Sequence, residues 1–166
     1  YRNVGGEKER MQDMGQVFLG VRLQCAQCHH HPYEKWSQDD YYGLAAFFTT
    51  LENKQARPGE GAFVHRSKIA LSKNPSSEQD LGPALPGRGS LELSPGDDPR
   101  QALADWVVDP ENPYFARMIA NRYWKHFFGR GLVDPEDDMR TTNPPTHPAL
   151  LAALEEHVIK SKFDLK

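Results

Sequence analysis

The sequence feature that most constrains the fold is Cys25-Ala26-Gln27-Cys28-His29, a C-x-x-C-H motif that contains both cysteines of the chain. This spacing is the attachment signature of c-type haem, because two thiols so spaced reach the two vinyl groups of one porphyrin. The histidine that follows the second cysteine then lies under the iron, where its imidazole is the proximal ligand. The motif therefore predicts haem c bound through Cys25 and Cys28, with His29 on the iron.

A C-x-x-C pair also occurs in zinc sites, dithiol redox enzymes and local disulfides. The chain has no further cysteine for a second C-x-x-C pair, which excludes the usual zinc ribbon. A zinc site made from both thiols and two histidines stays open, and its histidine candidates are His31, His65 and His126. A dithiol site is less favoured, because His30-His31-Pro32 is a poor start for the helix that should follow it. A local disulfide or a buried thiol pair is the remaining alternative.

Length and composition limit what the rest of the chain can form. At 166 residues it is one domain, or two small domains that share a core. Hydrophobic residues make up 38%, enough for a modest core, while 13 glycines and 13 prolines predict much irregular backbone. The net charge of −3 gives no general attraction to nucleic acid, and no apolar run is long enough to span a bilayer. Because the chain opens without Met, we expect a fragment or processed piece, whose missing targeting signal says little about location.

The first 52 residues are predicted to form one helical segment around the motif. Apolar residues at helical spacing predict a helix over residues 7–23. After the motif, Ser37 with Asp40 three residues later resembles a capping box that opens a helix to about Glu52. Trp36, just before this cap, is expected in the core, with cover of a porphyrin edge as the alternative.

Residues 53–98 are predicted to be an irregular linker rich in proline and glycine. Two short runs, 62–65 and 68–71, are expected to form a β-hairpin with each other. The linker's basic residues suggest a solvated face, with a docking patch for an acidic redox partner as the alternative. A loop this long in a compact protein is either functional or a mobile connector.

Residues 99–166 are predicted to be a helical domain. Asp98-Pro99 is typical of a helix start, and the helix is expected to stop before Pro110. Asn112-Pro113 repeats this device for the longest helix, which Gly129 should end. Thr146 is expected to cap the last helix. The predicted fold is mainly α, and segments 1–52 and 99–166 are expected to share one core.

Three residues of the long helix, Met118, Arg122 and His126, lie four apart and therefore fall on one stripe. If this stripe faces a haem, His126 or Met118 supplies the sixth iron ligand and Arg122 pairs with a propionate. The alternative is that each has an ordinary structural role in the core or at the surface. His31 lies too close to His29 to reach the opposite haem face, so a second-shell role that orients a ligand suits it better.

Other chemistry has little support in the sequence. The acidic residues of 134–138 do not have the spacing of a known calcium loop, so we expect solvated charge there. Neither G-x-S-x-G nor H-E-x-x-H occurs, which leaves a hydrolytic function without a motif.

Longer phrases carry a resemblance to a known family. The run from Phe18 to His29, followed by His31-Pro32 and by residues 39–48, resembles the end of a planctomycete cytochrome-c-like domain of unknown function. The later phrases Asn112-Pro113-Tyr114-Phe115-Ala116-Arg117 and Phe128-Gly129-Arg130-Gly131-Leu132-Val133 resemble the companion domain that follows it in the same large secreted proteins. The resemblance implies a cytochrome-c-like helical arrangement and an extracytoplasmic protein, periplasmic or secreted, but no established reaction.

Two functions from different classes follow. The first is a non-enzymatic electron-transfer module that exchanges electrons through an exposed haem edge with a redox partner protein or with other parts of the same chain. The second is a structural or interaction domain whose cysteine and histidine side chains bind zinc or close a local disulfide.

Overall fold

The computed structural model describes residues 5–57, 60–65, 68–94 and 96–165, without the side chains of 53–65. The chain divides into two compact units. The first contains residues 1–13 and 23–103, and the second contains residues 14–22 and 104–166. Among the described residues, helix is more frequent than strand, and the short strands all lie between α2 and α3. The prediction of a mainly α chain therefore holds in outline.

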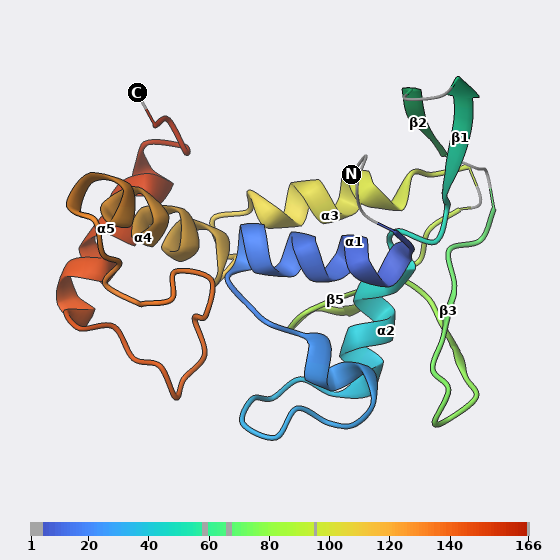
Figure 1. Ribbon diagram of the computed structural model, residues 1–166, viewed down its shortest axis with the longest axis horizontal. Coiled ribbons are helices and arrows are strands. Elements are labelled where there is room, and N and C mark those ends of the chain that lie inside the picture. The colour runs from blue at the N-terminus through green and yellow to red at the C-terminus, as the bar shows by residue number, and fades with distance from the viewer. Residues whose placement is uncertain (1–4, 58–59, 66–67, 95, 166) are drawn as a thin grey trace. The chain divides into compact units, whose positions relative to one another are not determined.

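The first unit is built around helix α2, Gln38–Ala46 (Figure 1). Its start is the predicted capping box: Ser37 Oγ accepts from the Asp40 N–H at 3.0 Å, and Asp40 Oδ2 accepts from the Ser37 N–H at 2.8 Å. Seven of its nine residues are buried, since both the strands and the cysteine loop contact it. Helix α1, Glu7–Met14, and the 3-10 turn η2, Gln24–Gln27, precede it in the chain.

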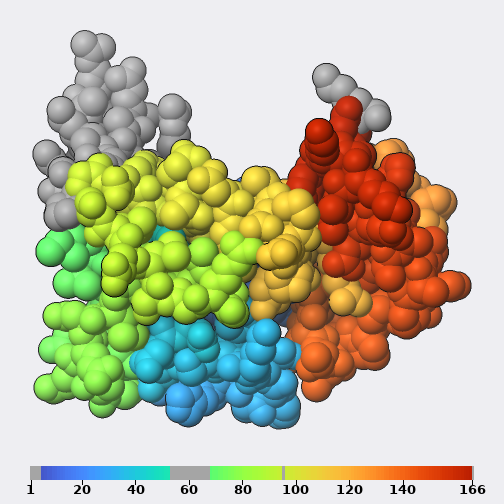
Figure 2. All heavy atoms as spheres, turned by 180° about the vertical axis from the view of Figure 1, so that it is seen from behind, coloured from blue at the N-terminus to red at the C-terminus, as the bar shows by residue number. Residues whose placement is uncertain are grey.

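The linker of the first unit contains three antiparallel two-stranded ladders among its described residues. The first ladder pairs β1, Leu51–Arg57, with β2, Glu60–His65. The others pair β3, Ser72–Lys73, with β4, Asp80–Leu81, and β5, Ala84–Leu85, with β6, Gly89–Ser90. In the space-filling view, residues 70–94 spread over the surface beside the residues of α2 and the cysteine loop (Figure 2).

The predicted hairpin is correct for one strand and wrong for its partner. Residues 62–65 do form a strand, but they pair with residues 51–54, and segment 68–71 lies outside the ladders. The same pairing shortens the predicted helix, because residues 51 and 52 belong to β1. Helix α2 ends at Ala46, where the N–H groups of Phe48 and Thr49 donate back to the carbonyls of Ala45 and Ala46.

Helix α3, Pro99–Val107, starts as predicted. The Arg100 N–H donates to Asp98 Oδ1 at 3.0 Å, so Asp98 caps the helix ahead of Pro99. The first five residues of α3 belong to the first unit and the last four to the second.

In the second unit, helix α4, Phe115–Phe128, packs against helix α5, Pro148–Lys160 (Figure 1). Their shared core contains Ala116, Ala120, Leu132, Val133, Leu151 and Val158. The predicted start at Asn112-Pro113 is wrong, because the N-cap of α4 is Tyr114. Asn112 Oδ1 still accepts from the Tyr114 and Phe115 N–H groups and so holds the turn that leads into the helix. Gly129 ends α4 at φ +80°, a left-handed conformation that favours glycine.

Two predictions about helix ends are wrong. The cap of α5 is His147, whose Nδ1 accepts from the Leu150 N–H at 3.2 Å, whereas Thr146 donates twice to the Leu132 carbonyl. The first helix is α-helical only to Met14 and continues as a π-turn, η1, over Gly15–Leu19. The wider turn displaces the apolar spacing, so Leu19 is buried while Val17 and Phe18, expected on the apolar face, are exposed.

Candidate functional site

The C-x-x-C-H motif forms a short turn at the surface of the first unit. Residues Gln24–Gln27 make a single 3-10 turn, and the Cys28 N–H closes it by donating to the Cys25 carbonyl at 3.4 Å. Both cysteines are exposed free thiols, so no disulfide joins them in this structure. The turn therefore presents two thiols and His29 to the outside, as covalent attachment of a group requires.

His29 has a defined hydrogen-bond polarity. Its Nδ1 lies 2.7 Å from the carbonyl oxygen of His30. Because a carbonyl can only accept, Nδ1 carries the hydrogen and donates it. In the neutral ring, Nε2 then keeps its lone pair, which is the form that binds a metal ion.

His31 has the opposite polarity. Its Nδ1 accepts from the Tyr33 N–H at 3.3 Å, so in the neutral ring the hydrogen lies on Nε2. A ring in this state donates from Nε2 and has no lone pair there for a metal. The arrangement suits the second-shell role predicted for His31 better than the role of a zinc ligand.

Gln27, the residue before Cys28, connects the turn to the interior. Its backbone carbonyl accepts from Tyr42 Oη at 3.1 Å and from Gln38 Nε2 at 3.3 Å. Its side-chain Oε1 accepts from Tyr41 Oη at 3.2 Å, and the Tyr41 oxygen in turn accepts from Gln12 Nε2 of α1 at 2.7 Å. Gln27 is thus bonded directly to α2, and through Tyr41 it is linked to α1.

Burial raises the pKa of both tyrosine hydroxyls above the ordinary value. Desolvation raises the pKa of Tyr41 to about 12, although the hydrogen bond from Gln12 acts in the opposite direction. Burial also raises the pKa of Tyr42, and the neighbouring Cys28 adds to this effect. At neutral pH both hydroxyls can therefore donate to Gln27.

The predicted distal and propionate residues belong to the second unit, whereas the motif belongs to the first. Met118 is buried, whereas His126 is exposed. The Arg122 side chain is half-buried, and its Nε has no hydrogen-bond partner among the described residues. Their roles toward a haem stay predictions.

The zinc alternative has no assembled donor set in the described part of the chain. A structural zinc ion takes four ligands, usually thiolates and imidazoles. Among the described residues, no three histidine, cysteine or acidic side chains come together to hold a metal ion. The side chain of His65 lies outside the described residues.

The acidic cluster of the second unit is neutralised by basic side chains, in place of the solvated charge that was expected. Asp137 accepts from Arg22 at 2.7 Å and also from Gln16, and Lys125 bonds Glu136. Arg130 lies 3.5 Å from Asp134, and Arg140 lies 2.8 Å from Asp138. These carboxylates hold the segment after α4 in place.

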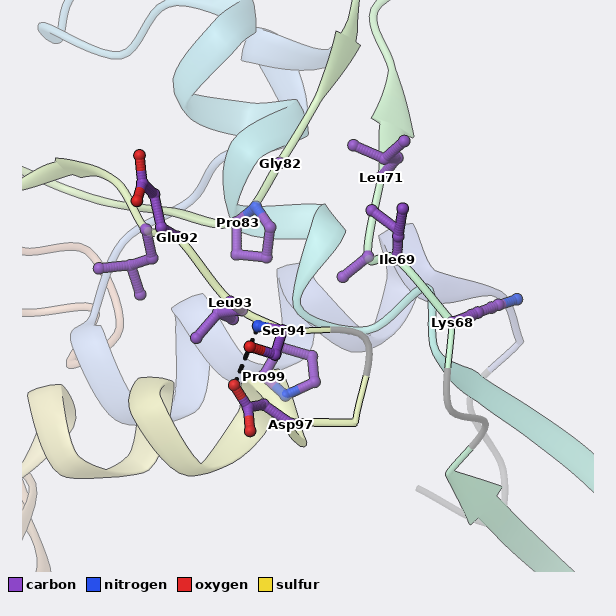
Figure 3. A pocket seen from close by; sticks show the side chains of 12 residues that line it. Lys68, Ile69, Leu71, Gly82, Pro83, Glu92, Leu93, Ser94, Asp97 and Pro99 are labelled. Carbon is purple, nitrogen blue, oxygen red and sulfur yellow. Dashed lines mark hydrogen bonds between the residues drawn. The ribbon is translucent and has the colours of Figure 1, made fainter.

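A separate pocket of about 500 Å³ lies in the linker of the first unit, between segments 68–71 and 91–99 (Figure 3). Ile69, Leu71 and Leu93 give it apolar walls. Its Asp97 carboxylate already accepts from the Ser94 N–H at 2.9 Å. None of the lining residues belongs to the C-x-x-C-H turn, so the pocket is not part of that site.

No site role was predicted for Gln27, Tyr41 or Tyr42. Tyr41 was expected on the apolar face of a helix and is buried there, and Tyr42, for which no role was predicted, is buried beside it. The available signal was two adjacent tyrosines on a helix that follows the motif closely, since a buried tyrosine hydroxyl usually finds a partner.

Two family models match the chain. Residues 2–53 match PSCyt2, a protein of unknown function (DUF1549), and residues 99–166 match PSD1, a protein of unknown function (DUF1553). These two parts of the chain are thus similar to two families of unknown function, in line with the resemblance in outline. Comparisons with curated proteins and with solved structures give no match. Among the described helices, none has the length and apolar character to cross a membrane.

Proposed function

We propose that the chain binds one c-type haem through Cys25, Cys28 and His29, in a cytochrome-c-like helical arrangement. It would serve as the electron-transfer module of a larger extracytoplasmic protein. The observation that carries the proposal is the polarity of His29: Nδ1–H donates to the His30 carbonyl at 2.7 Å, which leaves the Nε2 lone pair for iron. The adjacent thiols are both free and exposed, so the donor set fits the group.

Each thiol would hold the porphyrin by adding across a vinyl double bond. The Cys25 and Cys28 thiols would each give up an S–H bond and form a C–S bond at the expense of the vinyl π bond, with the hydrogen passing to the other vinyl carbon. No electron is gained or lost in this addition. When bound, the haem supplies reversible one-electron chemistry at iron.

The chain's own residues fix the group and leave it accessible. Because the two thiols and His29 are exposed, an edge of the group would face outward, where a redox partner or another part of the same chain can approach. Outer-sphere electron exchange needs no acid–base residue. The module is therefore proposed as non-enzymatic.

The proposal is tested by making the chain in a host with cytochrome c maturation machinery and recording its absorption spectrum. We expect a Soret band that survives denaturation and acid–acetone extraction, and that is lost in the Cys25→Ser/Cys28→Ser variant. His29→Ala should change the iron spectrum, whereas His30→Ala, at the neighbouring exposed histidine, should not. A wild-type chain that stays colourless under these conditions would overturn the proposal.

A further inference from the structure

The C-x-x-C-H turn is held in place by buried groups. Tyr41, Tyr42 and Gln38, which donate to Gln27, are 0%, 1% and 9% exposed. A buried donor that loses its partner gains no bond to water in exchange, so these hydrogen bonds are costly to break. The turn itself is at the surface, but the groups that hold it belong to the core.

The hydrogen bonds to the Gln27 carbonyl also affect the rest of the motif, because of where this carbonyl lies in the turn. The Gln27 carbonyl and the Cys28 N–H belong to one planar peptide group. Fixing the carbonyl toward Tyr42 and Gln38 therefore fixes the direction of the Cys28 N–H, which closes the turn onto the Cys25 carbonyl. The orientation of this peptide group therefore helps to set the backbone positions of Cys25, Cys28 and His29.

We infer that Tyr41 and Tyr42 are positioning residues that set the C-x-x-C-H turn before a haem is attached, an inference that rests on the haem-binding function proposed above. Tyr42 holds the backbone of Gln27, and Tyr41 holds its side chain and links it to Gln12. Thiol addition then starts from a turn that is already ordered. Reacting groups held in place react faster than groups that must first be ordered.

The first measurement is amide hydrogen exchange on the cofactor-free 166-residue chain. Loss of one hydrogen bond in Tyr42→Phe should speed exchange of the Cys28 amide about fivefold, while amides in the middle of α2 keep their rates. Tyr41→Phe should have a smaller effect on the same amide, since it frees only the side chain of Gln27. Gln38→Met, which removes the other donor to the Gln27 carbonyl, gives an independent variant with the expectation of Tyr42→Phe.

The matched control is Tyr33→Phe, a tyrosine in the same loop whose ring is 67% exposed. It should leave the exchange rate of Cys28 unchanged. Unchanged exchange in both Tyr42→Phe and Gln38→Met would overturn the inference. So would a uniform rise that includes the α2 amides, because it would show a general loss of stability.

The second measurement follows covalent haem attachment to equal amounts of folded chain. Tyr42→Phe should slow attachment roughly tenfold, and Tyr33→Phe should match the wild type. Equal rates in Tyr42→Phe and the wild type would overturn the inference while leaving the haem proposal intact. A wild type that takes up no haem would overturn the haem proposal and with it the role in attachment, and the exchange data would still show whether the tyrosines hold the turn.

Discussion

The side chain of Asn121 forms two hydrogen bonds with the backbone of Val133. Asn121 Nδ2 donates to the Val133 carbonyl at 2.9 Å, and the Val133 N–H donates to Oδ1 at 2.9 Å. Asn121 is 0% exposed. Helix α4 thus supplies the partners that a neighbouring strand would otherwise give to this buried backbone.

Replacing Asn121 by Leu should therefore destabilise the chain by about 2–4 kcal/mol, because two buried backbone groups lose their partners. Asn143→Ala, which removes amide contacts nearer the surface, should cost about 1 kcal/mol or less. Urea unfolding curves measure both values. Similar losses in the two variants would contradict the role given to Asn121.

Gly43 provides a test of close packing between α2 and β5. A Cβ at Gly43 would lie 2.8 Å from the Cβ of Ala84, nearer than two such atoms can approach. Alanine is the better helix former by about 1 kcal/mol, but overpacking costs about 1–3 kcal/mol. We therefore expect Gly43→Ala to be destabilising on balance.

The double variant Gly43→Ala/Ala84→Gly tests the cause of this loss. Removing the Ala84 methyl should restore much of the stability, giving a favourable coupling of about 1 kcal/mol in a double-mutant cycle. Gly82→Ala, where a new Cβ meets nothing within 4 Å, serves as the control and should be close to neutral. Additive losses would show that contact with Ala84 is not the cause.

Asp137 predicts a pH dependence of stability. Burial raises its pKa, but hydrogen bonds from Gln16 and Arg22 outweigh burial, so the pKa lies below the ordinary 3.8. Because the pKa of Asp137 is lower in the folded chain than the ordinary 3.8 of the unfolded chain, its ionisation stabilises the folded state above pH 3.8. This stabilisation is lost as the pH falls through the pKa of Asp137 in the folded chain. Asp137→Asn should thus cost about 1 kcal/mol at neutral pH and progressively less under acid.

Urea unfolding of wild type and Asp137→Asn, from neutral pH to about pH 3, measures this difference. Asp13→Asn, at an exposed carboxylate, is the control. A stability difference that stays constant down to the acid end would show that the charge of Asp137 contributes nothing.

Two adjacent phenylalanines at the end of α4 should differ in how much they contribute to the free energy of unfolding. Phe127 and Phe128 are 70% and 66% exposed, but Phe128 stacks on Trp124 with ring centroids 4.1 Å apart. Phe128→Ser should cost about 1 kcal/mol, since an aromatic pair contributes about 0.5–1.5 kcal/mol, and Phe127→Ser should cost less. The buried Phe48→Ala, at about 3–5 kcal/mol, sets the scale in the same unfolding assay. Equal losses at 127 and 128 would contradict the stacking argument.

Helix starts were predictable where the sequence states the capping chemistry. Ser37 with Asp40 and Asp98 before Pro99 act as expected at helix starts, because each depends on residues next to it in the chain. Gly129 likewise ends α4 where expected. The ends of the first two helices and the strand partners were less predictable. Helix α2 ends at Ala46 in turns that bond Phe48 and Thr49 back to Ala45 and Ala46, and residues 51–57 then pair with 60–65, a partner that no spacing rule gives.

The sequence was enough to name the residues of the candidate site, but not the hydrogen bonds that hold them. The motif names Cys25, Cys28 and His29 directly. The hydrogen-bond polarity of His29 and His31 depends on how the backbone folds around each ring, which no spacing rule gives. The contacts of Tyr41 and Tyr42 with Gln27 join residues 14 and 15 positions apart, so only the tertiary structure shows them.

The two letters written as x in this motif are constrained as well. Ala26 is 0% exposed, and its neighbour Gln27 accepts three hydrogen bonds. A library randomised at these two positions and selected for a folded, haem-loaded product should therefore return small residues at 26 and side-chain acceptors at 27. In this chain all five residues of the motif are therefore constrained, because Ala26 is buried and Gln27 is bonded to the core.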